Sequence, residues 1–183
     1  MSSTYNFPTR LLWLDLEMTG LVPSQDVILE VGSIVTDFEF NVLDSYESRV
    51  SNPVELVKSR MDVNPWWQDY PGNRKQFIRG LADAESIDKV EQHLCDVVAK
   101  YFGSERAVLA GNSIYNDRLF IKQWMPKLES LLHYRMLDVS SLKIIMQGKF
   151  GQEYKKPPVH RALSDIRASI AELQSYLEFF GKE

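Results

Sequence analysis

The chain has 183 residues, of which 44% are hydrophobic and 25% charged, and this composition excludes a disordered tail, a collagen-like fibre and a coiled coil. Lys and Arg number 21 against 25 Asp and Glu, which gives a net charge of −4. Proteins that coat long nucleic acids are usually basic, so we expect no such partner. No apolar run reaches the ~18–20 residues that span a bilayer, so no membrane association is expected either.

The length predicts a single domain over residues 1–183. Cys95 is the only cysteine, which excludes an intrachain disulfide and a cysteine-based zinc site and favours a reducing compartment. The first residues lack a basic segment followed by an apolar one, so we expect no secretory signal. The cytoplasm is the expected location, and an organelle stays open as an alternative.

In chain order, the first half predicts three strands, which cover residues 10–17, 27–36 and 41–50. The gaps between them are shorter than ten residues, too short for a helical crossover, so an antiparallel meander is expected. Residues 51–83 contain Pro53, Pro65, Pro71 and the pair Trp66-Trp67, and we expect irregular structure there.

The second half alternates between helical and strand patterns. Apolar residues from Ile87 to Tyr101 recur at steps of three and four, which predicts a helix with Ser86 as N-cap and Gly103 at its end. The remaining predicted elements are strands at 107–110 and 135–139, helices at 117–125, 127–133, 140–147 and 163–177, and a polar loop at 148–159. Strands separated by helices pair in parallel, so the fold class is α/β, with a mixed five-stranded sheet flanked by helices.

Asp15 and Glu17 interrupt the apolar first strand two residues apart, so both side chains lie on one face. Two adjacent carboxylates repel each other and lose hydration when they are partly buried. A hard divalent cation with oxygen ligands would offset both costs. The pair therefore predicts a metal site, with two solvated charges on a wet face as the alternative.

Three further polar residues extend this candidate site. Asp117 comes at the start of a predicted helix, where an acidic residue is also common for electrostatic reasons. His160 and Asp165 are five residues apart, ~140° around a helix at ~100° per residue. We therefore place His160 on the loop before the last helix, where it could lie over a site that Asp165 lines; an ordinary loop histidine is the alternative.

The order of these motifs resembles the DEDDh family of 3′→5′ exonucleases, and most closely the oligoribonuclease family within it. The segment 13–21 is similar to that family's first motif, Gly111-Asn-Ser113 before Asp117 to its second, and residues 160–166 to its third. The segment 133–140 also resembles a family segment. The likeness runs from about Leu11 to Leu177 and is loose at 51–85 and 148–159.

The resemblance implies an RNase H-like exonuclease fold with two Mg²⁺ or Mn²⁺ ions per active site. Asp15, Glu17, Asp117 and Asp165 would hold the ions, and His160 would act as general base, which suits an imidazole near neutral pH. Two such ions can activate the attacking water and hold the leaving 3′ oxygen of a phosphodiester. The implied activity is hydrolysis of very short RNA, two to five nucleotides long with dinucleotides preferred, to 5′-mononucleotides.

The same resemblance implies substrate-binding roles for residues outside the carboxylate set. Leu21 is similar to a wedge between two bases, and Trp66 or Trp67 to a stacking platform, although both tryptophans could equally be core residues. A cap over the 5′-phosphate would consist of Ser113, Arg135 and Ser140. Tyr134 resembles a residue contributed by a second protomer, which implies a homodimer.

The chain departs from the family pattern in one place. The family usually has a histidine a few residues after the tryptophan, and no His occurs between Met61 and Leu81. Arg74 or Lys75 could reach the phosphate instead. The departure leaves the two-nucleotide limit open. Two other functions are the alternatives: a DEDDh exonuclease that trims or proofreads longer RNA or DNA 3′ ends, and an inactive nucleotide-binding scaffold on the same fold.

Overall fold

The computed structural model describes residues 8–155 and 161–181, which form a mixed five-stranded sheet in the order β3-β2-β1-β4-β5. The strands β1 (Leu11–Met18), β2 (Ile28–Thr36) and β3 (Val42–Arg49) form an antiparallel meander. The strands β4 (Ala107–Gly111) and β5 (Leu132–Asp138) extend the sheet in parallel with β1. The fold class predicted from the sequence is confirmed.

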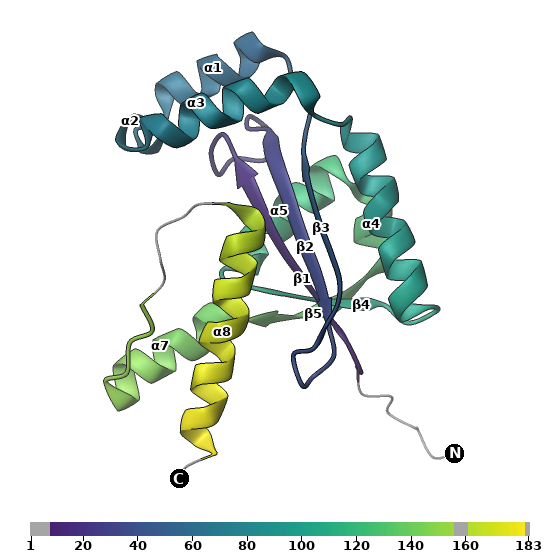
Figure 1. Ribbon diagram of the computed structural model, residues 1–183, viewed down its shortest axis with the longest axis vertical. Coiled ribbons are helices and arrows are strands. Elements are labelled where there is room, and N and C mark those ends of the chain that lie inside the picture. Colours follow the sequence, from purple (N-terminus) through teal and green to yellow (C-terminus); the bar gives the residue numbers. More distant parts are fainter. Residues whose placement is uncertain (1–7, 156–160, 182–183) are drawn as a thin grey trace.

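Helices cover both faces of this sheet (Figure 1). One face carries α4 (Ile87–Phe102), α5 (Ile114–Trp124) and α6 (Pro126–Leu131), and the other carries α7 (Val139–Phe150) and α8 (Ala162–Phe180). The alternation of β1 serves both faces, because Leu12, Leu14 and Leu16 join the first core and Leu11 and Trp13 the second. Among the described residues, no helix is both long and apolar enough to pass through a bilayer.

The expectation of irregular structure at 51–83 was wrong. This segment forms α1 (Val54–Val63), α2 (Trp66–Asp69), α3 (Pro71–Gly80) and the 3₁₀ turn η1 (Leu81–Asp83). Its prolines begin helices instead of breaking them, since Pro53 and Pro65 are N-cap residues and Pro71 occupies the first turn of α3. The three helices lie across the end of the sheet where β1 finishes (Figure 1).

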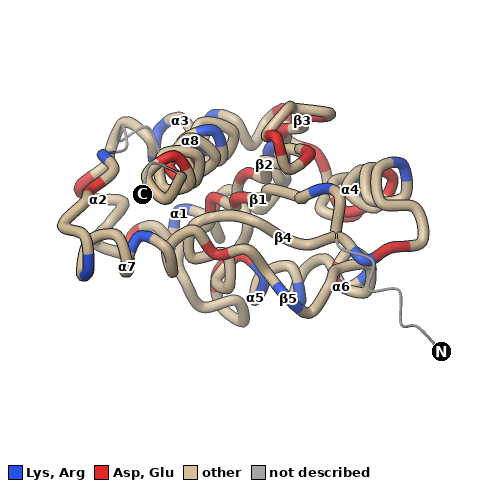
Figure 2. The backbone as a smooth tube through the Cα atoms, turned by 90° about the horizontal axis from the view of Figure 1, so that it is seen from below, with Lys and Arg blue, Asp and Glu red and all other residues tan. Residues whose placement is uncertain are grey.

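Several predicted boundaries shift by a few residues. The helix α5 begins at Ile114, three residues before Asp117, and α6 ends at Leu131, so that His133 belongs to β5. The helix α7 continues to Phe150 and shortens the predicted loop. Figure 2 shows Lys and Arg dispersed over several elements.

Candidate active site

The first three predicted metal ligands come together where β1 ends. Asp15 and Glu17 point from β1 toward α8, on the same face as Leu11 and Trp13, and Asp165 lies in the first turn of α8. One carboxylate oxygen from each of the three lies within 4.8 Å of the others. All three residues are half-buried. Oxygen donors at this spacing fit a hard divalent cation such as Mg²⁺ or Mn²⁺.

A glycine lets α8 approach the sheet closely enough for this cluster to form. A Cβ atom added to Gly32 of β2 would lie only 2.7 Å from the Cβ atom of Ala162, at the start of α8. Real side chains do not tolerate that distance, so any larger residue at position 32 would push the helix away from the sheet. The position of Asp165 therefore depends on the absence of a side chain at Gly32.

The fourth predicted ligand, Asp117, reaches the site from the opposite helical layer. The strand β1 pairs with β4 only at Leu12 and Trp13 and then runs on, so the amide of Leu16 has no β4 partner and donates to Oδ1 of Asp117 at 2.9 Å. Asp117 is only 6% exposed. Among the described residues it is not part of the 4.8 Å group, although its charge acts on Glu17.

Burial dominates the electrostatics of this site. It raises the pKa of Glu17 to about 8, with further contributions from the charges of Asp165 and Glu30. Burial likewise raises the pKa of Asp117 to about 7, against the hydrogen bond from Leu16. Each shift reflects negative charge that lacks compensation, and a divalent cation supplies that compensation directly.

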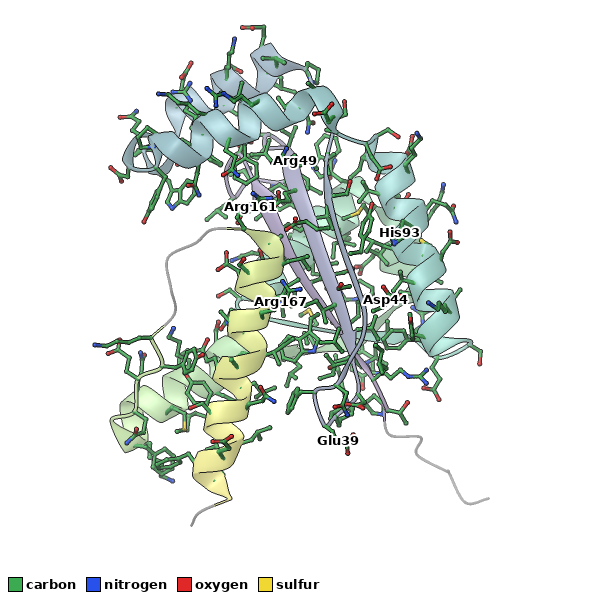
Figure 3. The ribbon with its side chains drawn as sticks, viewed as in Figure 1. Glu39, Asp44, Arg49, His93, Arg161 and Arg167 are labelled. Carbon is green, nitrogen blue, oxygen red and sulfur yellow. The ribbon has the colours of Figure 1, made fainter. Side chains whose placement is uncertain are left out.

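The sequence reasoning missed Glu30 and Arg161, which fasten α8 to the sheet. Glu30 is fully buried on β2, directly opposite Glu17 in the register. Its carboxylate accepts two hydrogen bonds from the Arg161 guanidinium, at 2.9 and 2.8 Å, and a third from the amide of Ala162 at 3.2 Å. The amide of Arg161 in turn donates to Oδ2 of Asp165. Figure 3 shows Arg161 and Arg49, a second neighbour of Glu30, at the same end of the sheet.

A signal for this pair was present in the sequence. Glu30 interrupts the apolar run of 27–36 just as Asp15 and Glu17 interrupt their own strand, and a charge inside a buried strand requires a partner. The predicted general base, His160, lies outside the described residues. Arg161 follows it directly in the chain, so the fastening by Glu30 lies one residue from the position that the sequence assigns to the base.

The structure brings together two of the three residues predicted for the phosphate cap. The hydroxyl oxygens of Ser113 and Ser140 are 3.2 Å apart, and the Ser113 amide donates to both Oγ of Ser140 and Oδ1 of Asp138. Asp138 also caps α7 through the Ser140 amide. Arg135 and Tyr134 are exposed on β5, with the guanidinium 5.3 Å from the centre of the Tyr134 ring.

The two tryptophans have different environments. Trp67 is 1% exposed, contacts Phe77 edge to face and donates its ring N–H to the carbonyl of Thr19. Trp66 is half-buried and stacks on Tyr70 at 4.5 Å. The same Thr19 anchors the turn that presents Leu21, whose side chain is 72% exposed. An exposed leucine and a partly exposed indole can both meet a base, whereas Trp67 is a core residue.

Comparison with known proteins agrees with this geometry. The exonuclease family model, RNase_T, matches residues 12–173. The oligoribonuclease of Ruthia magnifica is 35% identical over 179 residues, covering 96% of this chain and 98% of that protein, and the oligoribonuclease of Chromobacterium violaceum is 38% identical over 177 residues, covering 94% and 96%. The exonuclease I structure from Methylocaldum szegediense aligns with a TM-score of 0.61 at 15% identity and covers 90% of this chain. This chain spans only 39% of that longer protein, so the alignment shows the shared fold alone.

The fold, the carboxylate cluster and the matched family model define an exonuclease, a hydrolase of nucleic acid ends. Within that class, identity above one third over almost the full length of both proteins is decisive. The chain belongs to the oligoribonuclease family.

Proposed function

We propose that this protein hydrolyses very short RNA from the 3′ end, with dinucleotides as preferred substrates and 5′-mononucleotides as products. Family membership makes it a 3′→5′ exoribonuclease that acts on short RNA. One observation carries the proposal. Carboxylate oxygens of Asp15 and Glu17 on β1 and of Asp165 on α8, two elements far apart in the sequence, lie within 4.8 Å of one another.

These carboxylates fit a divalent metal centre by donor type, spacing and electrostatics. We assign Asp15, Glu17 and Asp165, together with Asp117, as the residues that would hold two ions, Mg²⁺ or Mn²⁺. When bound, such ions neutralise the phosphodiester and activate the attacking water. The protein's own contribution is rigidity, because β1, α5 and α8 fix the four side chains.

We assign proton transfer to His160, because a neutral imidazole can accept the proton of the attacking water near neutral pH. The segment that carries it continues directly into Arg161, which Glu30 holds through two hydrogen bonds. The Glu30–Arg161 pair therefore limits how far Arg161, the residue after His160, can move relative to Asp165.

The proposed substrate contacts come from residues outside the carboxylate cluster. We assign Leu21 as the wedge between two bases and Trp66, rather than the buried Trp67, as the stacking residue. Ser113, Ser140 and the Arg135 guanidinium would bind the 5′-phosphate, for which a planar fork of N–H donors is well suited. A closed 5′ end explains a preference for dinucleotides, since a longer chain has no room to continue.

A homodimer completes this proposal. Tyr134 is 71% exposed on β5, the edge strand of the sheet, and Ile144 and Ile145 are exposed on the adjoining α7. An edge strand followed by exposed apolar side chains is suited to contact a second copy, which would bring Tyr134 to the partner's site.

The single cysteine, Cys95, fits a reducing compartment, and we propose the cytoplasm.

A length series tests the function. The purified protein is mixed with end-labelled RNA of two, three, five, seven and twenty nucleotides, with Mn²⁺ or with EDTA. We expect the dinucleotide to be cleaved fastest, rates to fall with length, and EDTA to stop the reaction until Mn²⁺ is restored. Equal rates on the two-mer and twenty-mer would favour 3′-end trimming of longer chains. Binding without cleavage in any metal would indicate an inactive scaffold.

A further inference from the structure

Ser113 adopts a backbone conformation that an L-residue rarely takes. Its φ of 50° and ψ of 32° lie in the left-handed region, at the junction between β4 and α5. Only Ser113 and Phe40, among the described non-glycine residues, have a positive φ. Such a conformation costs energy and persists only where surrounding contacts hold it. At Ser113 these contacts are the Asp138 carboxylate and the Ser140 hydroxyl, both of which accept from its amide.

A series of hydrogen bonds connects this strained turn to buried side chains of α8. The Ser140 hydroxyl donates to Oδ1 of Asn112 at 3.2 Å. The Asn112 side-chain amide then donates to Oγ of Ser169 at 2.8 Å and to Oε2 of Glu172 at 3.1 Å. The other oxygen of Glu172 accepts from the Tyr176 hydroxyl at 2.7 Å. The hydrogen bonds therefore connect a fully buried carboxylate to the hydroxyl groups of the partly buried Ser140 and the exposed Ser113.

The chemistry of this series fixes its direction. A carboxylate only accepts hydrogen bonds, so Glu172 requires the NH₂ group of Asn112 to face it, which leaves Oδ1 of Asn112 toward Ser140. Oδ1 in turn takes the single hydroxyl hydrogen of Ser140. Ser140 can then act only as an acceptor toward Ser113, so the single hydroxyl hydrogen of Ser113 points to Ser140 when no ligand is bound, and it is the hydrogen that can turn to a ligand oxygen.

Glu172 itself is placed at considerable cost. It is 0% exposed, and Nζ of Lys143 on α7 lies 3.6 Å from its Oε1. A hydrophobic side chain in this position between two helices would avoid the desolvation of a charge. Glu172 lies two turns from Asp165 on the same helix, so nothing in the carboxylate cluster accounts for it. A buried, fully hydrogen-bonded polar network is instead suited to hold a group in one orientation.

We propose that Glu172 and Asn112 are positioning residues for the 5′-phosphate of the substrate: the buried carboxylate orients the Asn112 amide, which holds Ser140 and the left-handed turn at Ser113. This inference rests on the proposed function, in which Ser113 and Ser140 form the cap over that phosphate; Ser140 contributes by holding Ser113, because its own hydroxyl hydrogen is committed to Asn112. It goes further by assigning part of the specificity for a phosphorylated 5′ end to the buried Glu172 and the partly buried Asn112, which do not touch the substrate.

The test compares one dinucleotide in two forms, with a 5′-phosphate and with a 5′-hydroxyl. For the wild type we expect a higher kcat/KM on the phosphorylated form. The substitution Asn112→Ala removes the connection and leaves the formal charge unchanged. We expect it to reduce the ratio of the two kcat/KM values at least ~10-fold, mainly through KM of the phosphorylated form. Glu172→Gln should lower the same ratio, because a glutamine no longer dictates the orientation of Asn112.

The matched control is Glu91→Gln. Glu91 is also a buried glutamate, 3% exposed, but it accepts hydrogen bonds from the amides of Lys127 and Leu128 at the start of α6, on the other face of the sheet. We expect a lower Tm with an unchanged ratio. Equal ratios for the wild type and both network variants would overturn the inference, as would a wild type without any preference for the 5′-phosphate. Failure of the proposed function looks different, because neither dinucleotide would then be cleaved.

Discussion

Glu17 and Asp117 hold pKa values of about 8 and about 7, and this has a measurable consequence for the metal-free protein. An ordinary glutamate in the unfolded chain titrates near 4.5. Between pH 5 and 8 the folded protein therefore binds protons that the unfolded chain has released. The stability that this provides is complete at low pH and is lost as the pH rises through the folded pKa values.

We therefore predict that Tm in EDTA falls as the pH increases from about 5 to about 8. Metal ions bind the deprotonated carboxylates, so added Mn²⁺ should stabilise the protein most at the upper end of this range. Thermal unfolding followed by circular dichroism measures both effects. The variant Glu17→Gln removes the larger titration and should flatten the dependence in EDTA. A steep dependence that persists in this variant would contradict the assignment to Glu17.

Asp165 links the metal site to α8. We predict that Asp165→Asn lowers kcat by more than ~100-fold, since loss of even the outer partners of metal ligands costs about 10–100-fold. Its Tm in EDTA should equal or exceed the wild-type value, because the substitution removes a charge that repels Glu17. Near-normal turnover at saturating Mn²⁺ would show that Asp165 is not a ligand.

The Arg161 guanidinium offers a test of position without a change in any ligand. Arg161→Met leaves the fully buried Glu30 without its bidentate partner, which should cost about 3 kcal/mol of unfolding free energy. The start of α8 would also lose its attachment, so we expect kcat to fall. Arg167→Met is the matched control, because Arg167 is exposed on the same helix (Figure 3) and should change stability by less than about 0.5 kcal/mol.

At the scale of elements, strong periodic patterns predicted the sheet and the long helices, whereas the segment 51–83 was misjudged. The helix α2 has only four residues, too few to show a period, and α1 and α3 gain their stability from a separate core. In that core Val57, Met61 and Phe77 surround Trp67. These contacts are tertiary, so a scan of local preferences could not detect them.

The candidate site shows the same division. Asp15, Glu17 and Asp165 were predictable because acidic residues in apolar or motif-bearing segments stand out in a sequence. The partners that hold them were not, since Glu30 and Arg161 are 131 residues apart and no local pattern connects them. The left-handed conformation of Ser113 also escaped prediction, because that region is normally associated with glycine or asparagine.

The helical segment over the end of β1 supplies a prediction that separates the two tryptophans. Trp66→Ala should weaken dinucleotide binding by about 1–3 kcal/mol, the contribution of one stacked base, with a small effect on stability. Trp67→Ala should lower the unfolding free energy by about 3–5 kcal/mol, because it removes a fully buried indole. Isothermal titration in Ca²⁺, together with urea unfolding, measures both quantities. The reverse pattern would place Trp67, not Trp66, against the base.

At the scale of the whole molecule, the proposed dimer depends on exposed apolar side chains beside an edge strand. Ile144 is 70% exposed on α7. We predict that Ile144→Glu converts a dimer to a monomer in light scattering, because it places a charge in an apolar contact. Activity on dinucleotides should fall with it, since Tyr134 of a second copy would no longer reach the site. Lys143, the residue before Ile144, is unsuitable as a control because it pairs with Glu172, so Lys149→Glu at the end of α7 serves instead.

The continuity of α8 has a consequence for substrate length. Asp165 and Glu172 lie on one unbroken helix, seven residues apart, which corresponds to a rise of ~10.5 Å. In the proposed function, the helix therefore fixes the distance between the cluster where the bond would be cut and the cap that would recognise the 5′ end of the substrate. A loop in that role could stretch to admit one more nucleotide, but two turns of hydrogen-bonded helix cannot.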